Sequence, residues 1–170
     1  MIINGLKNNF FVFYNINFTM KIIITLILFL ILGCSSDSEI IPPIMSYNYS
    51  NNEIGLVDLV NNYRTNQGLS TLEINQHIGY LCSIHNQNMI ETGIVGHQNF
   101  ESRTNNLKLT MQVTYVSELV AKNYSTNQSV LNAFLNVPSC KEILDGDKDR
   151  IGLSIVESGG KKYYTLILIK

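Results

Sequence analysis

The C-terminal part of the chain constrains the fold most strongly, because it contains two runs of strand-forming residues around a pair of glycines. The runs RIGLSIVES (150–158) and KYYTLILIK (162–170) are rich in β-branched and aromatic residues, and Gly159-Gly160-Lys161 separates them. Two such runs around a short glycine turn are typical of an antiparallel hairpin. The sequence therefore predicts that the domain is built around an antiparallel sheet.

Upstream of the hairpin, apolar residues recur at helical spacing. One stripe covers residues 56–63 and stops before Gly68, and a second covers residues 74–89 and stops before Gly93. Steps of three and four residues predict amphipathic helices, and a glycine just past the stripe is a common helix end. The sequence therefore predicts two helices in the first half of the domain.

The segments between the second helix and the hairpin are less regular. The β-branched residues of VTYVSELVA favour a strand, and Pro138 ends a helix because proline disfavours helical geometry in the preceding residue. The predictions are a loop with a helical turn at 94–107, a strand at 113–121, a helix capped by Thr126 at 126–137 and a short turn at 139–147. This order lacks a regular βαβ alternation, so it predicts an α+β domain with helices packed on an antiparallel sheet.

The N-terminal region contains an apolar run that ends at a cysteine. In MKIIITLILFLILGC, Lys21 precedes the run, and Gly33 stands directly before Cys34. The run itself, 22–32, is shorter than the about 20 apolar residues that cross a bilayer. This pattern predicts a lipoprotein signal peptide at 20–33 and an acylated Cys34. An uncleaved membrane helix is the alternative.

These features divide the chain into four parts. Residues 1–19 are interpreted as an upstream extension, with Met20 as the true start, and residues 34–52 are predicted to be a flexible tether. Residues 53–170 are long enough for one domain with its own core. We therefore expect an exported protein that acylated Cys34 anchors to a bacterial cell membrane, at the outer membrane or cell surface.

Charge and motifs exclude several function classes. The net charge is −1 and the basic residues are scattered, so the sequence predicts no nucleic-acid surface. The sequence has no P-loop, GxGxxG, HExxH, CxxC or GxSxG motif. Residue spacing alone therefore names no reaction and no cofactor.

The histidines and cysteines are the remaining residues with reactive side chains. His77 occupies a polar helix position and is predicted to be solvated, whereas His85 lies in the apolar stripe and is predicted to be buried with a hydrogen bond. His97 follows a helix end in a loop, where functional residues often lie. Cys82 is predicted to be a core residue. The sequence does not decide whether Cys82 and Cys140 form a disulfide, because it does not give the distance between their Cα atoms.

Several segments in order resemble the CAP superfamily, which includes cysteine-rich secretory proteins, antigen 5 and plant pathogenesis-related proteins. The resemblance covers about Gly55 to Ile169. Its carriers are LVNNYRTNQGLSTL, HNQNMIETGIVGHQNFESR, SELVA and FLNVPSCKEILDGD, followed by the strands IGLSI and KYYTLILIK. The resemblance implies a three-layer αβα sandwich, in agreement with the predicted order of elements.

The resemblance also implies where a functional cleft would lie. Larger members of the family have a cleft with two His and two Glu that can bind a divalent metal. By this resemblance His97 matches the first His and Glu118 matches one Glu, while Cys140 stands at the position of the second His. The helix predicted at 126–137 contains no acidic residue for the second Glu. His97, Glu118 and Cys140 are therefore the cleft and metal candidates.

Two function classes follow from these candidates. The first is a non-catalytic binding or interaction domain, anchored to the membrane, whose partner is a protein, a lipid or a small molecule. The alternative is a hydrolase or zinc-dependent enzyme in which Cys140 acts with His97 and Glu118, since a thiolate is both a nucleophile and a zinc ligand. We expect the domain to fold without metal, because three ligands are too few for a closed structural zinc site.

Overall fold

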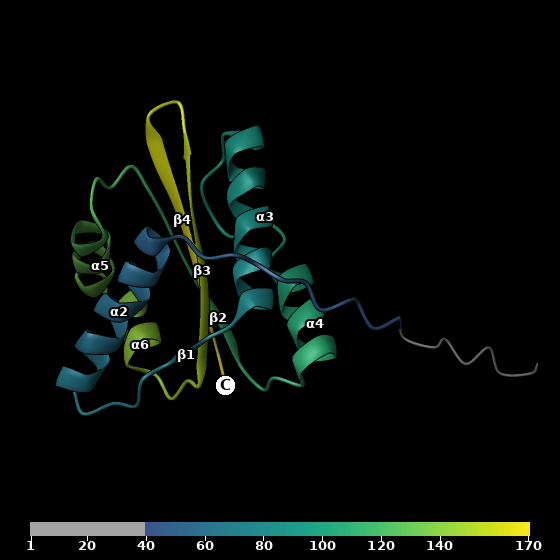
Figure 1. Ribbon diagram of the computed structural model, residues 1–170, viewed down its shortest axis with the longest axis horizontal. Coiled ribbons are helices and arrows are strands. Elements are labelled where there is room, and N and C mark those ends of the chain that lie inside the picture. The colour runs from purple at the N-terminus through teal and green to yellow at the C-terminus, as the bar shows by residue number, and fades with distance from the viewer. Residues whose placement is uncertain (1–39) are drawn as a thin grey trace, which may run out of the picture. The chain divides into compact units, whose positions relative to one another are not determined.

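Helices cover both faces of a four-stranded sheet in residues 41–170 (Figure 1). The computed structural model describes residues 40–170, so the predicted signal peptide at 20–33 and the acylation site at Cys34 lie outside the described residues. The elements are α2 (Asn51–Asn66), β1 (Glu73–Ile74), α3 (Gln76–Thr92), α4 (Phe100–Met111), β2 (Val116–Lys122), α5 (Asn127–Leu135), α6 (Pro138–Asp145), β3 (Arg150–Ser158) and β4 (Lys161–Ile169). None of the helices in this part of the chain is long and apolar enough to span a membrane.

The sheet has the order β1-β3-β4-β2. Strands β3 and β4 form the predicted antiparallel hairpin, and β2 pairs antiparallel with β4, with Glu118 opposite Ile167. Strand β1 pairs parallel with β3, so the sheet is mixed, and this one pairing departs from the predicted antiparallel sheet. A strand of two residues has too short a period-two pattern to be recognised from sequence.

The hairpin turn requires glycine. Gly159 and Gly160 have φ angles of 57° and 69°, a left-handed conformation at both central positions that other residues rarely adopt. Strand β4 then runs through the centre of the sheet, and all seven residues of 163–169 are buried. Burial on both faces explains why the strand is almost entirely apolar and does not alternate, with Thr165 as the buried polar exception.

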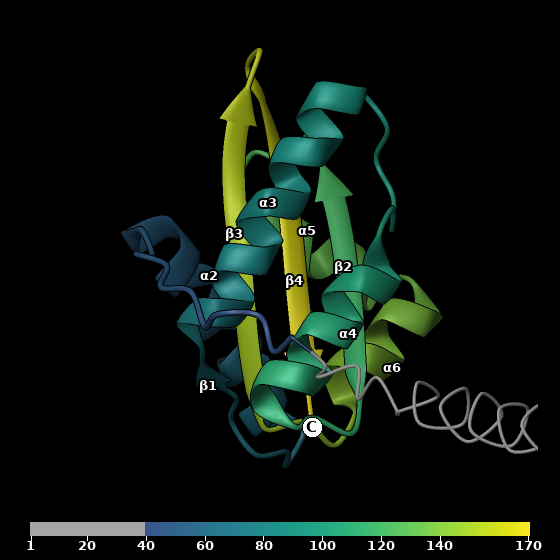
Figure 2. The ribbon, with the colours of Figure 1, turned by 90° about the vertical axis from the view of Figure 1, so that its right-hand side faces the viewer.

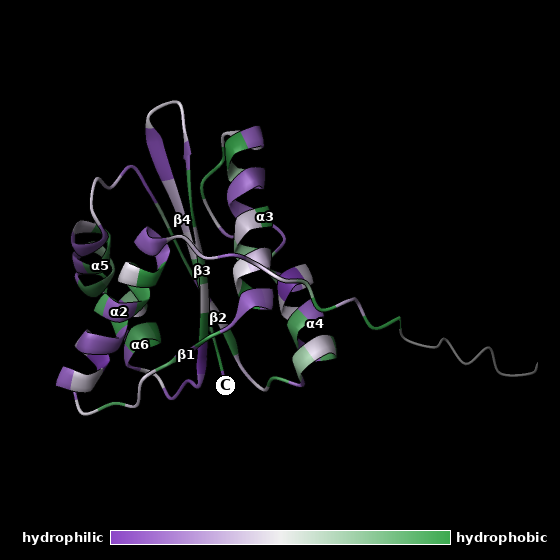
Figure 3. Ribbon diagram, viewed as in Figure 1, coloured by the Kyte–Doolittle hydropathy of each residue, from purple (hydrophilic) through white to green (hydrophobic). Residues whose placement is uncertain are grey.

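The two faces of the sheet carry separate clusters of buried apolar residues. Helices α2, α5 and α6 cover one face, here called the α2/α5/α6 face, and α3 and α4 cover the other, the α3/α4 face (Figure 2). Both helical layers mix hydrophobic and hydrophilic positions (Figure 3), as expected for helices with one side on a core. The order of layers is therefore the predicted three-layer αβα sandwich.

The domain begins before the predicted boundary at residue 53. Ser50 caps α2: its Oγ accepts from the Glu53 N–H at 3.3 Å, and Glu53 Oε2 accepts from the Ser50 N–H at 2.8 Å. Tyr49 Oη donates to the Asn75 carbonyl at 2.6 Å. Residues 45–50, here called the N-terminal strap, are therefore held on the domain, and the prediction of a tether up to residue 52 is wrong for this stretch.

Two helices are longer than the sequence indicated. The predicted helical turn in 94–107 is the twelve-residue helix α4, and the predicted turn at 139–147 contains the eight-residue helix α6. Helix α4 buries only Arg103 and Leu107, and α6 buries only Leu144. Helix α4 has one buried apolar residue, and the eight residues of α6 are fewer than the about 11-residue window in which helical periodicity is recognised.

Candidate functional site

The site is centred on Glu118 in strand β2. Its side chain is 1% exposed and points to the α3/α4 face, whereas the next residue, Leu119, packs in the core of the α2/α5/α6 face. This alternation is the ordinary period of a strand. A carboxylate in such a place requires partners, because burying an unpaired charge is costly.

Arg103 and His97 supply those partners. Arg103, one turn into α4, donates from Nε to Glu118 Oε2 at 2.7 Å and from Nη2 to Oε1 at 2.8 Å, and its Nη1 donates to the Gln98 carbonyl at 2.8 Å. His97 Nδ1 lies 2.9 Å from Glu118 Oε1. Because a carboxylate only accepts, Nδ1 carries the hydrogen. Both oxygens of Glu118 are therefore engaged by charged or polar donors.

His85 lies behind this group and is buried, with a hydrogen bond, as predicted. Its Nε2 donates to the Gly96 carbonyl at 2.8 Å and stands 3.7 Å from Glu118 Oε1. Burial lowers the pKa of His85, and the Glu118 carboxylate offsets that effect only in part. His85 is therefore neutral at pH 7, and it fixes the loop between α3 and α4 through Gly96.

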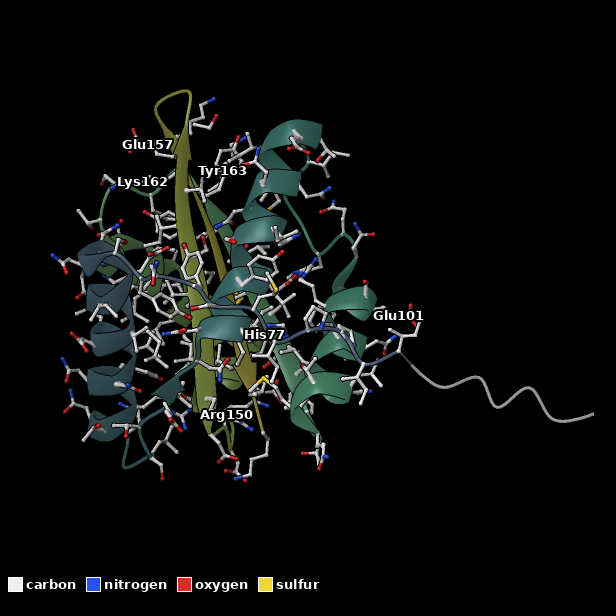
Figure 4. All side chains as sticks on the ribbon, turned by 45° about the vertical axis from the view of Figure 1, so that its right-hand side comes forward. His77, Glu101, Arg150, Glu157, Lys162 and Tyr163 are labelled. Atoms are coloured by element: carbon white, nitrogen blue, oxygen red, sulfur yellow. The ribbon has the colours of Figure 1, made fainter. Side chains whose placement is uncertain are left out.

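His77 is buried, so the prediction of a solvated histidine is wrong. Its ring accepts the Met45 N–H at Nδ1, at 3.0 Å, and its Nε2 therefore donates to Asn106 Oδ1 at 2.7 Å. The N-terminal strap crosses α3 here and covers a helix position that the apolar stripe had assigned to solvent (Figure 4). The apolar periodicity of α3 indicates which side of the helix faces the sheet. It gives no indication that the N-terminal strap packs on the opposite side.

The structure does not bring Cys140 to this site. Cys140 lies on α6, is half-buried and packs against the core of the α2/α5/α6 face, with the sheet between it and the α3/α4 face. Cys82 is buried on α3, where its Sγ donates to the Gly152 carbonyl at 3.4 Å and burial raises its pKa. Both cysteines are free thiols.

Two adjoining cavities lie along α4, next to His97. The larger has a volume of about 750 Å³ and the smaller about 300 Å³. Asn99, Ser102 and Asn106 line both cavities, so the two are neighbours, and the surface that they form together is here called the α3–α4 groove. Sequence reasoning missed these polar residues. Their spacing of three and four residues places them on one side of α4, but such spacing is equally typical of a solvated helix face.

Comparison with known proteins places the chain in a family. Residues 57–169 match the sequence profile of CAP, the cysteine-rich secretory protein family. The chain belongs to the CAP family. No curated protein sequence matches this CAP chain.

Solved structures share its fold at low sequence identity. An outer surface protein from Borrelia burgdorferi is 21% identical, with a TM-score of 0.64 over 74% of this CAP chain and 98% of its own. An extracellular protein with an SCP domain from Bacillus anthracis is 20% identical, with a TM-score of 0.63 over 70% of this chain. A cysteine-rich secretory protein from Staphylococcus aureus is 18% identical, with a TM-score of 0.61 over 70%. The last two are longer proteins, of which this chain spans 40% and 38%.

The residues of this CAP domain do not fit the divalent metal that the family's cleft implies. Residues 40–170 contain no group of three His, Cys, Asp or Glu side chains that could hold a metal ion. Glu118 is 1% exposed and already accepts hydrogen bonds from Arg103 and His97, so a metal would have to compete with these donors for a buried carboxylate. A catalytic zinc site has three protein ligands, and Cys140 lies on the other face. No metal-dependent step follows from this arrangement.

Proposed function

We propose that this CAP domain is a non-catalytic binding module, exported and held at a bacterial membrane by acylated Cys34. The observation that carries the first part is the engagement of Glu118. Arg103 binds both of its oxygens and His97 binds one of them, within a side chain that is 1% exposed. A general base or a metal ligand must be reached by its substrate or metal, whereas this buried carboxylate accepts from Arg103 and His97 and so holds α4 and the His97 loop in place.

The alternative function, an enzyme that uses Cys140 as nucleophile, is not favoured by the position of this residue. A Cys-His dyad needs thiol and imidazole within hydrogen-bond reach, about 2.6–3.2 Å. Cys140 packs in the core of the α2/α5/α6 face, whereas His97 contacts Glu118 on the opposite face. The geometry therefore favours binding over covalent catalysis.

The binding surface that we propose is the α3–α4 groove. His97 lines its larger cavity with a side chain that is 56% exposed, and His85 and Arg103 line its smaller one. Arg103, which lines the smaller cavity, also binds Glu118 and so holds α4, one side of the groove, against strand β2. A preformed cavity on a rigid scaffold is the usual setting of a ligand site.

Export and anchoring are supported by the N-terminal sequence. The apolar run 22–32 ends in Leu-Gly-Cys and is followed by two serines. Two of the similar structures are described as an outer surface protein and an extracellular protein. Cys34 would then hold the domain at the membrane, with its groove available to ligands outside the cell.

The non-catalytic proposal is tested with His97→Ala in the full chain, extracted from membranes in detergent. We expect hydrolysis of p-nitrophenyl acetate, p-nitrophenyl phosphate and casein to stay at the buffer background in both proteins, with and without zinc. The matched control is Asn62→Ala, an exposed change on α2. Turnover that His97→Ala abolishes and Asn62→Ala retains would contradict the proposal.

Anchoring is tested by mass spectrometry of the membrane-extracted protein. We expect a mature chain that begins at Cys34 and carries acyl chains, and a Cys34→Ser chain that leaves the membrane fraction or keeps its leader. An N-terminal peptide that still contains 22–33 in the wild-type protein would disprove this part without bearing on the groove.

A further inference from the structure

We propose that the α3–α4 groove binds a neutral, polyhydroxylated ligand, a segment of a glycan. This inference rests on the proposed function, because it names the ligand class of the same groove. It follows from three features of the lining: the hydrogen-bonding groups, the charges and the apolar surfaces between them.

The hydrogen-bonding groups are mostly carboxamides. Asn99, Asn105 and Asn106 line the larger cavity with Ser102, and Asn88 lines the smaller one. A carboxamide has two N–H donors and an acceptor oxygen on one planar group. It can therefore donate to one hydroxyl and accept from its neighbour, which matches the paired hydroxyls of a sugar ring. Asn106 retains its amide donors because His77 uses its Oδ1.

Asn99 is the strongest single indication. It stands at the N-cap of α4 in a left-handed conformation, φ 58°, and makes no side-chain cap hydrogen bond. An N-cap Asn ordinarily uses its side chain to accept a backbone N–H of the first turn. Here the amide instead lines both cavities, at the point where they join. Asn tolerates this left-handed backbone better than other non-Gly residues, so Asn99 can hold its amide away from the cap without strain.

The charges argue against an ionic ligand. Arg103 lines the smaller cavity, but its Nε, Nη1 and Nη2 already donate to Glu118 and to the Gln98 carbonyl. The larger cavity contains a single carboxylate, Glu101, which Figure 4 places on the outer side of α4. An anion such as a phosphate would meet this carboxylate and find no unengaged guanidinium or ammonium in the lining.

The apolar part of the lining fits a sugar better than an acyl chain. Phe100, Leu109 and Pro42 line the larger cavity, and Leu81 and Ile84 line the smaller one. These side chains are interleaved with the carboxamides. An acyl chain would therefore displace the water that hydrogen-bonds to the amides and would supply no hydrogen bonds in its place. A sugar ring has hydroxyls at its edge and C–H groups on its face, and it can satisfy both kinds of surface.

The size of the groove indicates more than one sugar ring. Both volumes, about 750 Å³ and about 300 Å³, reach the about 300–1,000 Å³ range of ligand pockets. Because Asn99, Ser102 and Asn106 border both cavities, a linear ligand that passes over these three residues would contact both. A short stretch of an oligosaccharide therefore fits this surface, rather than a free monosaccharide.

The test is calorimetric titration of the full chain, in a detergent without a sugar headgroup, with hexasaccharides of dextran, mannan, cellulose and chitin. The chitin arm represents N-acetylated sugars, the chemistry of bacterial cell walls, and the other arms represent neutral hexose polysaccharides. We expect at least one hexasaccharide to bind, and the monosaccharide of the same series to bind about tenfold more weakly or less.

The variants connect binding to the groove. Asn99→Gly removes the amide while glycine accepts the left-handed backbone, and Asn105→Leu replaces an exposed amide on α4. We expect each to weaken hexasaccharide binding about tenfold, the order of one lost hydrogen-bond group, while Asn62→Leu on α2 leaves it unchanged.

The proposal is overturned if no hexasaccharide binds, if Asn62→Leu weakens binding as much as Asn99→Gly, or if heparin or oleate binds at the groove instead. Each of these results leaves the hydrolysis assays with His97→Ala unaffected. The non-catalytic proposal can therefore survive the failure of the glycan proposal.

Discussion

The two faces of the sheet are built from the same kinds of elements but are stabilised in different ways. The core of the α2/α5/α6 face contains fifteen buried apolar residues, whereas that of the α3/α4 face contains seven. In place of further apolar residues, the second face buries His77, His85, Asn86, Arg103 and Glu118. Fewer apolar contacts and more buried polar groups are typical of the part of a domain that carries function.

This difference has a physical consequence for the two faces. Apolar burial is non-directional and tolerates rearrangement, whereas a buried ion pair stabilises only one geometry. The α3/α4 face therefore holds α4 and the loop with His97 in a defined position at the expense of stability. Four substitutions test this comparison, in order of decreasing expected effect.

The largest effect is expected for Glu118→Ala on the α3/α4 face. The change leaves the Arg103 guanidinium buried without its carboxylate, and breaking a buried pair in this way costs about 3–5 kcal/mol. Urea unfolding followed by circular dichroism measures the loss. Glu101→Ala, at an exposed position of the same helix, should change the free energy of unfolding by less than about 0.5 kcal/mol. A similar loss in both variants would contradict the assignment.

The second-largest loss of stability is expected for Arg64→Met on the α2/α5/α6 face. Arg64 is 1% exposed and donates to the carbonyls of Ser70, Leu144 and Gly146, so it ties α2 to the end of α6. Removing it leaves these carbonyls without their donor, at a cost of about 2–4 kcal/mol. The same urea assay measures it, with the exposed Lys108→Met as control. A loss below about 1 kcal/mol would show that Arg64 contributes packing alone.

The same comparison explains how much could be predicted from the sequence. The helices α2 and α3 were predicted because each buries a periodic apolar face, and the hairpin was predicted because two strand-forming runs flank a glycine pair. Thr126 was recognised as the cap of α5, and it does accept the Ser129 N–H at 3.1 Å. Apolar periodicity is strongest where burial is apolar.

The site was less predictable because its members are polar and come from three elements. His97 and Glu118 were indicated by the family resemblance, and the structure brings them together. Arg103 was not singled out, although it contacts both oxygens of Glu118. Cys140 was aligned with a cleft position, but α6 carries it onto the opposite face, where it packs with apolar residues. Spacing along the chain reports neither a partner across the sheet nor the face on which a side chain lies.

The third prediction concerns the N-terminal strap, which the sequence had assigned to a tether. A Cβ added at Gly79 would lie 2.2 Å from Tyr49 Oη and 2.8 Å from the Tyr47 ring, so Gly79→Ala must displace the strap from α3. We expect a loss of about 1–3 kcal/mol, the usual cost of overpacking. Gly55→Ala in α2 is the matched control, because its nearest neighbour would be 3.5 Å away. That change should stabilise the domain by about 0.5–1 kcal/mol. A stabilising Gly79→Ala would show that the strap does not need this contact.

The smallest effect is a pH dependence that His85 gives to the α3/α4 face. Burial lowers the pKa of His85 below its ordinary value of 6.5, so the folded protein resists a proton that the unfolded chain accepts. The unfolded state therefore binds more protons below about pH 6.5, and stability falls as the pH drops through that value, by at most about 1.4 kcal/mol per pH unit. His85→Gln keeps an N–H donor for the Gly96 carbonyl but does not titrate. Urea midpoints at pH 7.5, 6.5 and 5.5 should decline less steeply in this variant than in the wild-type protein. If the two slopes are equal, folding does not lower the pKa of His85, and His85 is not the group that links the stability of this face to pH.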